Sequence, residues 1–216
     1  MDDLLTQRDL VLEGLWLTIQ IAVLSGVCSL VLGTVLAAMR VGPVSVLRGA
    51  AATYVTLVRN TPLLIIFVFV FIAAPNIGWF VDTPFLAKGV IAVSVYTAAF
   101  VCEAVRSGVN AVPLGQAEAA RAIGLTFGQT MTSVVLPQAF RVVVPPLASV
   151  LIAMTKNTSI AAVFGLAELT FRMRYFSNNS ADDTAIFVVF AILYIVLVEL
   201  ISGSAIGLER RWRAAR

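Results

Sequence analysis

Long apolar runs separated by short polar segments make up most of this chain. A helix that crosses a membrane needs about 20 mostly apolar residues. The stretches that reach this length cover about residues 14–39, 49–74, 85–109, 138–164 and 185–207. Proline and glycine mark breaks between them, and Arg59-Asn60-Thr61-Pro62 interrupts the second run. The pattern predicts an all-α, polytopic membrane bundle of about five helices, forming one transmembrane domain over residues 1–216.

The composition favours the same class, since 60% of the residues are hydrophobic and 12% are charged, against about 25% charged in a soluble domain. The formal charge of +3 is too small to indicate nucleic-acid binding. Histidine is absent, which excludes imidazole chemistry and the commonest metal ligand. Cys28 and Cys102 lie in separate apolar runs, so we expect two buried hydrophobic side chains and no metal site.

The distribution of lysine and arginine predicts the orientation, because these residues are enriched in cytoplasmic loops. One side of the expected spans carries Arg40, Arg48, Arg121, Arg141 and the arginine-rich tail at 210–216. The other side carries Asp2, Asp3, Asp9, Glu13, Asp82, Asp182 and Asp183, with the cations Arg8, Lys88, Arg172 and Arg174. We therefore expect a multi-pass protein of the cell membrane with its N-terminus outside and its C-terminus in the cytoplasm. The acidic start, Met1-Asp2-Asp3, is not typical of a cleaved secretory signal.

Two cations lie within the apolar runs, Arg59 in the second and Lys156 in the fourth. Such a charge costs about 2.5 to 3.5 kcal/mol at the membrane centre and is expected to face protein or a wet cavity. Hydrogen-bonding side chains follow each cation: Asn60 and Thr61, and Asn157, Thr158 and Ser159. We expect these seven residues to form a positively biased site at the membrane midplane, with no intramembrane aspartate nearby. The alternatives are that the cations satisfy backbone carbonyls or snorkel, or that Arg59 pairs with Glu103.

Glu103 and Arg106 lie one helical turn apart near the end of the third span. They are expected to form a structural ion pair, or alternatively a gate. An intramembrane enzyme is disfavoured, because the spans hold no histidine and few carboxylates. The sequence has no G-x-x-x-x-G-K-[ST] motif, so energy from ATP would have to come from a partner.

The polar segment at about 110–137 carries a recognisable pattern. Its residues are Glu118, Ala119, Ala120, Gly124, Leu136 and Pro137, with Val134 where isoleucine is usual. This pattern resembles the EAA loop of ABC-importer permeases, which docks the membrane subunit onto a cytoplasmic ATPase. Gly124 would permit a sharp break after the alanine-rich helix. A passive channel would not need such a loop.

The likeness to polar amino-acid ABC permeases extends over nearly the whole chain. The segments that carry it are 58–63 (Val-Arg-Asn-Thr-Pro-Leu), 103–120, 156–159 (Lys-Asn-Thr-Ser) and 165–169. The chain resembles actinobacterial glutamate permeases in particular. The resemblance implies a type I importer fold and a substrate cavity lined by Arg59, Asn60, Thr61, Lys156, Asn157, Thr158 and Ser159.

The expected function is therefore that of a permease subunit in an ATP-driven importer for a polar amino acid, with glutamate or aspartate first. Asn157 stands where permeases for basic amino acids often have aspartate. The alternatives are glutamine or another polar amino acid, or a passive channel or structural membrane subunit. The implied partners are ATPases, which use ATP and magnesium, a second permease and an extracytoplasmic amino-acid-binding protein. The chain itself is expected to carry no cofactor. The outward segment 168–183 would meet the binding protein or form a solvated connecting helix.

Overall fold

The computed structural model describes residues 6–179 and 183–214, and every regular element in these ranges is helical. The long helices are α2 (Arg8–Val41), α6 (Phe85–Asn110), α9 (Leu136–Asn157) and α11 (Asp183–Ala214). The shorter helices are α3 (Ser45–Arg59), α4 (Leu63–Val68), α5 (Ala74–Asn76), α7 (Leu114–Ala122), α8 (Phe127–Thr130) and α10 (Leu169–Asn179). Two π-helical segments, η1 (Phe69–Ala73) and η2 (Met131–Val135), and a 3₁₀ segment, η3 (Thr158–Phe164), complete the set. The all-α prediction is confirmed. Asp2, Asp3, Asp182 and Arg216 of the topology argument lie outside the described residues.

Within the described residues, four helical segments are long and apolar enough to cross a membrane: Arg8–Val41, Phe85–Asn110, Phe127–Phe164 and Asp183–Gly203. A fifth candidate is the pair Ser45–Arg59 and Leu63–Asn76, whose axes bend by 103° at their junction. The prediction of about five spans holds when this pair counts as one. The sharp bend was not predicted, since the second run was expected to continue as one span from 49 to 74.

The bend between α3 and α4 follows from Pro62, which lacks a backbone N–H and disfavours helical geometry in the residue before it. Two side chains bond carbonyls in the last turn of α3. Asn60 Nδ2 donates to the Thr56 carbonyl at 2.8 Å, and Thr61 Oγ1 donates to the Leu57 carbonyl at 2.8 Å. Arg59 therefore ends a helix at a corner of the fold.

The broken second span packs against the end of the fourth through aromatic rings. The Phe164 ring lies 5.3 Å from the ring of Phe67 and 5.1 Å from that of Phe71, measured between centroids. Phe67 itself is fully buried. This cluster joins α4 and η1 to η3, and so fixes the two broken segments against each other.

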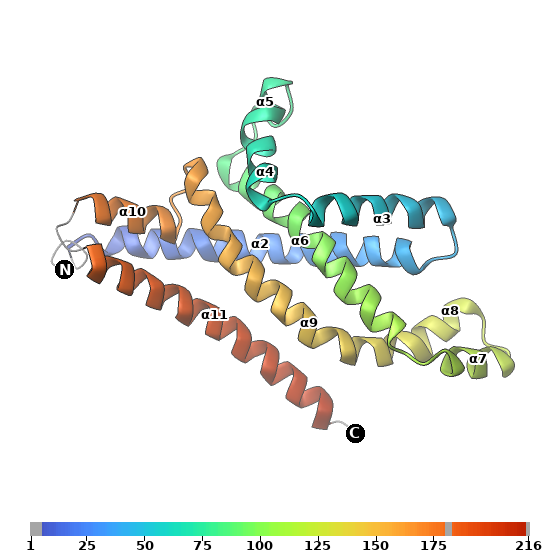
Figure 1. Cartoon of the computed structure of the whole chain (residues 1–216). Helices are drawn as coiled ribbons and strands as arrows, with labels where there is room; N and C mark the ends of the chain where they lie inside the picture. The colour runs from blue at the N-terminus through green and yellow to red at the C-terminus, as the bar shows by residue number, and fades with distance from the viewer. Residues whose placement is uncertain (1–5, 180–182, 215–216) are drawn as a thin grey trace.

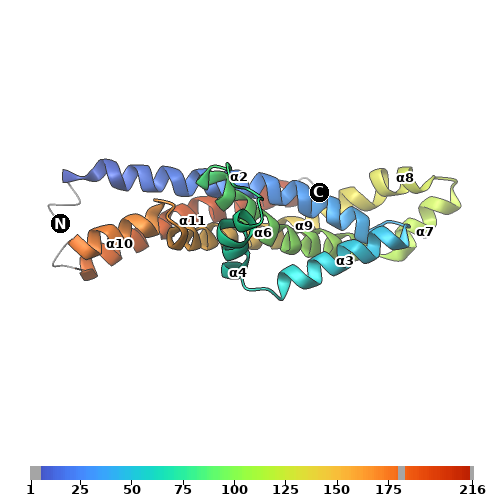
Figure 2. The ribbon, with the colours of Figure 1, turned by 90° about the horizontal axis from the view of Figure 1, so that it is seen from above.

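Several helix ends lie at two opposite extremities of the molecule, whereas α4 and α5 project from its middle (Figures 1 and 2). The start of α2 lies beside α10 and the start of α11, whereas α7 and α8 extend beyond the far end. The α2–α3 connection lies toward the same far end (Figure 1). The start of α2 and α10 are thus separated in the fold from the α2–α3 connection and α7.

Close packing of α2 on α6 depends on small side chains. A Cβ at Gly33 would lie 2.5 Å from the Cβ of Val101, so these helices approach as closely as glycine permits. Cys102 is buried on α6, as expected. Cys28 is exposed on the surface of α2, which contradicts the expectation of a buried side chain. The apolar run around Cys28 has a surface that no described residue covers, and sequence hydrophobicity alone does not distinguish the two faces.

Candidate functional site

The fourth membrane-spanning segment changes from α to 3₁₀ geometry where its polar motif lies. Thr158 Oγ1 donates to the Thr155 carbonyl at 2.7 Å, and Ser159 Oγ donates to the Lys156 carbonyl at 2.8 Å. The segment ends at Gly165, whose φ of 86° is in the left-handed region that favours glycine. The hydroxyl groups, and not the neighbouring cation, therefore satisfy the carbonyls at this change of geometry.

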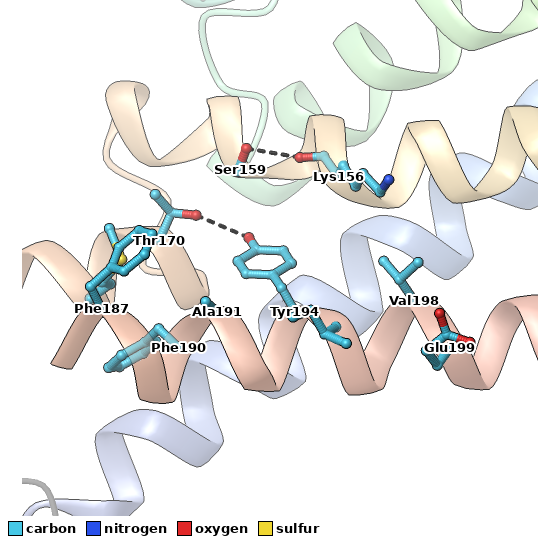
Figure 3. Close-up of a pocket in the computed structure, with 11 residues that line it drawn as sticks. Lys156, Ser159, Thr170, Phe187, Phe190, Ala191, Tyr194, Val198 and Glu199 are labelled. Carbon is cyan, nitrogen blue, oxygen red and sulfur yellow. Dashed lines mark hydrogen bonds between the residues drawn. The ribbon is translucent and has the colours of Figure 1, made fainter. Parts of the chain in front are cut away.

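A cavity of about 490 Å³ lies between α9, α10 and α11 (Figure 3). Lys156 and Ser159 line it from the fourth span, and Thr170 lines it from α10. Tyr194 and Glu199 line it from α11. The Lys156 side chain extends along α9, and Val198 and Glu199 of α11 lie at the same end of the cavity (Figure 3).

Glu199 adds a carboxylate to the Lys156 cavity, whereas the sequence reasoning considered only the absence of a nearby aspartate. It belongs to the apolar span Asp183–Gly203 and shares a cavity with Lys156. The sequence argument overlooked it, although the rule that selected Arg59 and Lys156 applies equally to a carboxylate in an apolar run. The Lys156 cavity is therefore of mixed charge.

A second cavity, of about 260 Å³, lies between α6 and α9 and is lined by Thr97, Phe100 and Asn157, among others. The Arg59 guanidinium lies over the Phe100 ring, 5.5 Å from its centroid. Successive residues of a helix point about 100° apart, so Lys156 and Asn157 open onto different cavities. The structure thus separates Lys156 and Asn157 between two cavities, and the single substrate site expected for both cations stays a prediction. Arg59 lies toward the Asn157 cavity and Lys156 lines the other.

Glu168 was expected in a solvated outward segment, but its side chain is fully buried. Its Oε1 accepts the backbone N–H of Phe171 at 3.0 Å, which caps the start of α10. Its Oε2 accepts the Tyr194 hydroxyl at 2.6 Å, and that hydroxyl also lies 3.0 Å from the hydroxyl of Thr170. Burial raises the pKa of the Glu168 carboxyl, against the opposing effect of these hydrogen bonds. The carboxyl joins α10 to α11 along one wall of the larger cavity.

Glu103 is the centre of a charged cluster between α2 and α6. Its carboxylate pairs with Arg106, with Oε2 2.7 Å from the nearer guanidinium nitrogen, and also with Arg40 at the end of α2. Arg59 is therefore not its partner. Arg40 and Arg106 also line a cavity of about 520 Å³ that reaches Ala117 of α7. The cluster thus lies where the spans meet the segment 110–137.

The segment 110–137 folds as two short helices around a tight turn. Gly124 follows α7 with a φ of 90°, which side chains rarely adopt. Thr126 then begins α8 with a capping box formed with Gln129. Glu118 and Ala119 are exposed, whereas Ala120 is buried. The exposed side chains of this segment leave a surface on which another protein can pack.

Matches to known proteins extend over nearly the whole chain. A family model described as "Binding-protein-dependent transport system inner membrane component" matches residues 29–214. The glutamate transport system permease protein GluC of Corynebacterium efficiens is 42% identical over 209 residues, which cover 92% of this chain and 91% of that protein. The probable glutamine ABC transporter permease protein GlnM of Bacillus subtilis is 35% identical, covering 93% and 92%. A solved structure described as an "amino acid ABC transporter with histidines" aligns with a TM-score of 0.88 at 28% identity, over 97% of both chains.

Proposed function

We propose that this protein carries an acidic amino acid into the cell. The chain belongs to the family of binding-protein-dependent transport system inner membrane components. It is the permease of an amino-acid ABC importer rather than its ATPase subunit. Glutamate and aspartate are the proposed substrates. The family implies that an ATPase and a binding protein work with this permease.

The observation that carries this proposal is that two cations in the membrane-spanning segments have no ion-pair partner among the described residues. Arg59 and Lys156 form no ion pair with any residue that the structure describes, although each lies at a break in a membrane-spanning segment. By contrast, Arg40 and Arg106 share the carboxylate of Glu103. An unpaired cation favours a carboxylate-bearing ligand, since charge-assisted hydrogen bonds are stronger than neutral ones. The 42% identity with a glutamate permease supports the same substrate class.

Glutamine is the second candidate, and Glu199 is the observation that favours it. This carboxylate lines the Lys156 cavity and reduces its positive bias, so a ligand of zero net charge becomes more acceptable there. The 35% identity with a probable glutamine permease supports this alternative. Asn157, which adds no charge, is compatible with either ligand.

The segment 110–137 is the proposed contact for the ATPase. Leu114 and Ile123 are 79% and 80% exposed at the two ends of α7, and exposed apolar side chains at one place favour a protein partner. The proposed coupling residues are Glu118, Ala119, Ala120, Gly124, Leu136 and Pro137. Ala120 is buried and would act by holding α7 in place. This end of the molecule would face the cytoplasm, and the end with α10 would face the binding protein outside.

Two permease subunits, identical or homologous, would enclose the substrate path. Apolar side chains along α11 support this arrangement, since Phe187, Ile195 and Leu200 are exposed in the single chain. Arg59, Asn60, Thr61, Lys156, Asn157, Thr158 and Ser159 remain the proposed substrate-site residues. The four hydroxyl and amide side chains that bond backbone carbonyls would shape the breaks, and the two cations would bind the ligand.

Uptake by the complete importer in proteoliposomes tests this function. We expect ATP-dependent uptake of labelled glutamate, with aspartate competing better than glutamine and arginine not competing. Lys156→Met keeps much of the side-chain length and should weaken glutamate binding roughly ten- to a hundredfold. A preference for glutamine over glutamate would contradict the acidic assignment. Uptake that proceeds without ATP would indicate a passive channel.

A further inference from the structure

The cavity between α9, α10 and α11 holds one cation and one carboxylate inside membrane-spanning segments. Lys156 lies near the end of α9 and Glu199 lies within the apolar span of α11. Among the described residues, neither side chain forms an ion pair or a hydrogen bond through its charged group, and the two do not pair with each other. In Figure 3 the Lys156 side chain lies beside α9 and the Glu199 carboxylate lies against α11, with Val198 between them in this view.

Both side chains are exposed in the single chain, and a charge in a membrane span is costly unless a polar group meets it. The rest of the wall supplies no competing charge among the described residues, since its other lining side chains are uncharged. Phe187 and Phe190 make the part of the wall distant from Glu199 apolar (Figure 3). The volume of about 490 Å³ accommodates a small molecule.

We propose that this cavity recognises the zwitterionic head of an α-amino acid, with Lys156 binding the α-carboxylate and Glu199 binding the α-ammonium group. The proposal rests on the amino-acid importer function given above and adds Glu199 as a specificity-determining residue. Each contact is a charge-assisted hydrogen bond, the strongest kind available to these groups. Lys156 and Glu199 would bind the α-carboxylate and the α-ammonium group, which all α-amino acids share. The pair would therefore select against ligands that lack the ammonium group.

The discriminating ligands are glutamate and glutarate, which is the same chain of five carbons with two carboxylates and no ammonium group. Binding is measured by calorimetry on the permease–ATPase complex without the binding protein, so that the selectivity of the binding protein does not contribute. The wild-type complex should bind glutamate at least tenfold more tightly than glutarate. Equal affinities in the wild type would overturn the proposal without any variant.

Glu199→Gln should weaken glutamate binding roughly ten- to a hundredfold and leave or improve glutarate binding, so that the preference disappears. Glu199→Asp keeps the charge and should keep part of the preference. Asp9→Asn removes an exposed carboxylate at the start of α2, outside the cavity, and serves as the matched control. Loss of affinity for both ligands by the same factor would show a merely structural role and overturn the assignment.

Lys156→Met tests the other half of the pair with 4-aminobutyrate, which lacks the α-carboxylate. The variant should lose glutamate affinity while its weak 4-aminobutyrate binding is unchanged. If the wild type prefers glutamine, the acidic-substrate function fails but the head-group assignment does not. Glutamine and glutaramate then form the corresponding ligand pair, and an unchanged glutamine preference in Glu199→Gln would overturn the assignment.

Discussion

Arg40 at the end of α2 forms an ion pair with Glu103 of α6, 63 positions later in the chain. Arg106 binds the same carboxylate one turn further along α6. The cluster joins the first and third spans beside the cavity that reaches α7.

Glu103→Gln should destabilise the protein, because it leaves Arg40 and Arg106 facing each other without a counter-charge. Breaking a buried ion pair costs about 3–5 kcal/mol. Since the Arg40 and Glu103 side chains keep 20% and 21% exposure, solvent screening reduces the expected loss to about 1–3 kcal/mol. Thermal unfolding in detergent measures it. The exposed Arg174 is the control position, and Arg174→Gln should have no effect. An unfolding temperature for Glu103→Gln equal to that of the wild type would show that the cluster adds nothing.

Gly124→Leu should disable coupling to the ATPase while the protein stays in the membrane. The φ of 90° at this position strains any side chain, so the turn after α7 would open. Nothing lies within 4 Å of a Cβ built there, so a clash of the new Cβ does not account for the effect. Gly49→Leu, in α3 outside the segment 110–137, has no such φ and nothing within 4 Å of a Cβ, and is the matched control. Full substrate-stimulated ATPase activity in Gly124→Leu would remove this segment from the coupling role.

The proposed orientation is tested by cysteine labelling in intact cells. In a background of Cys28→Ser and Cys102→Ala, a membrane-impermeant maleimide should label Asp9→Cys and not Gln116→Cys. The reason is that positively charged loops stay in the cytoplasm, and Gln116 lies in α7 at the end opposite to the start of α2 (Figure 1). Labelling of Gln116→Cys from outside would reverse the topology and rule out an ATPase contact at α7.

The sequence predicted those parts of the fold that depend on local rules. The number of spans followed from the length of apolar helix that a bilayer requires. The turn at Gly124 followed from the ability of glycine to adopt a positive φ. The bend at Pro62 was recognised as an interruption, but its angle depends on the packing of Phe67 and Phe71 against Phe164. Residues far apart in sequence make those contacts.

The arrangement of the candidate-site residues could not be predicted from the sequence. Lys156 and Asn157 are neighbours in sequence, yet α11 covers one and α6 the other. Which helices flank α9 is a tertiary property that the motif does not encode. Glu168 was placed in solvent because its sequence neighbourhood is polar, whereas Tyr194, 26 positions later, supplies its hydrogen bond.

Glu168 should make the stability of the protein depend on pH. Its carboxyl has a raised pKa in the folded state because it is buried, so the folded state binds its proton more tightly than the unfolded state does. Stability should therefore increase as the pH falls through the raised folded-state pKa, and the gain is complete below the ordinary value of the unfolded chain. Glu168→Gln, neutral at every pH, should lose this increase. Unfolding temperatures measured from pH 8 to pH 5 check the slope, and identical slopes for both proteins would contradict the assignment.

Asn157→Asp should change which amino acid the importer prefers. The side chain lines the cavity between α6 and α9, where the Arg59 guanidinium lies over Phe100. A new carboxylate would offset the positive charge of Arg59 and repel a ligand of net negative charge. We therefore expect glutamate uptake to fall relative to glutamine, and uptake of basic amino acids to rise. Competition assays with glutamate, glutamine and arginine measure the shift in preference. Ser149→Asp places a carboxylate in the same cavity but nearer the middle of α9, and shows whether the shift in preference depends on where in the cavity the charge lies. An unchanged preference in Asn157→Asp, together with normal glutamate affinity in Lys156→Met, would move the substrate site away from both cavities.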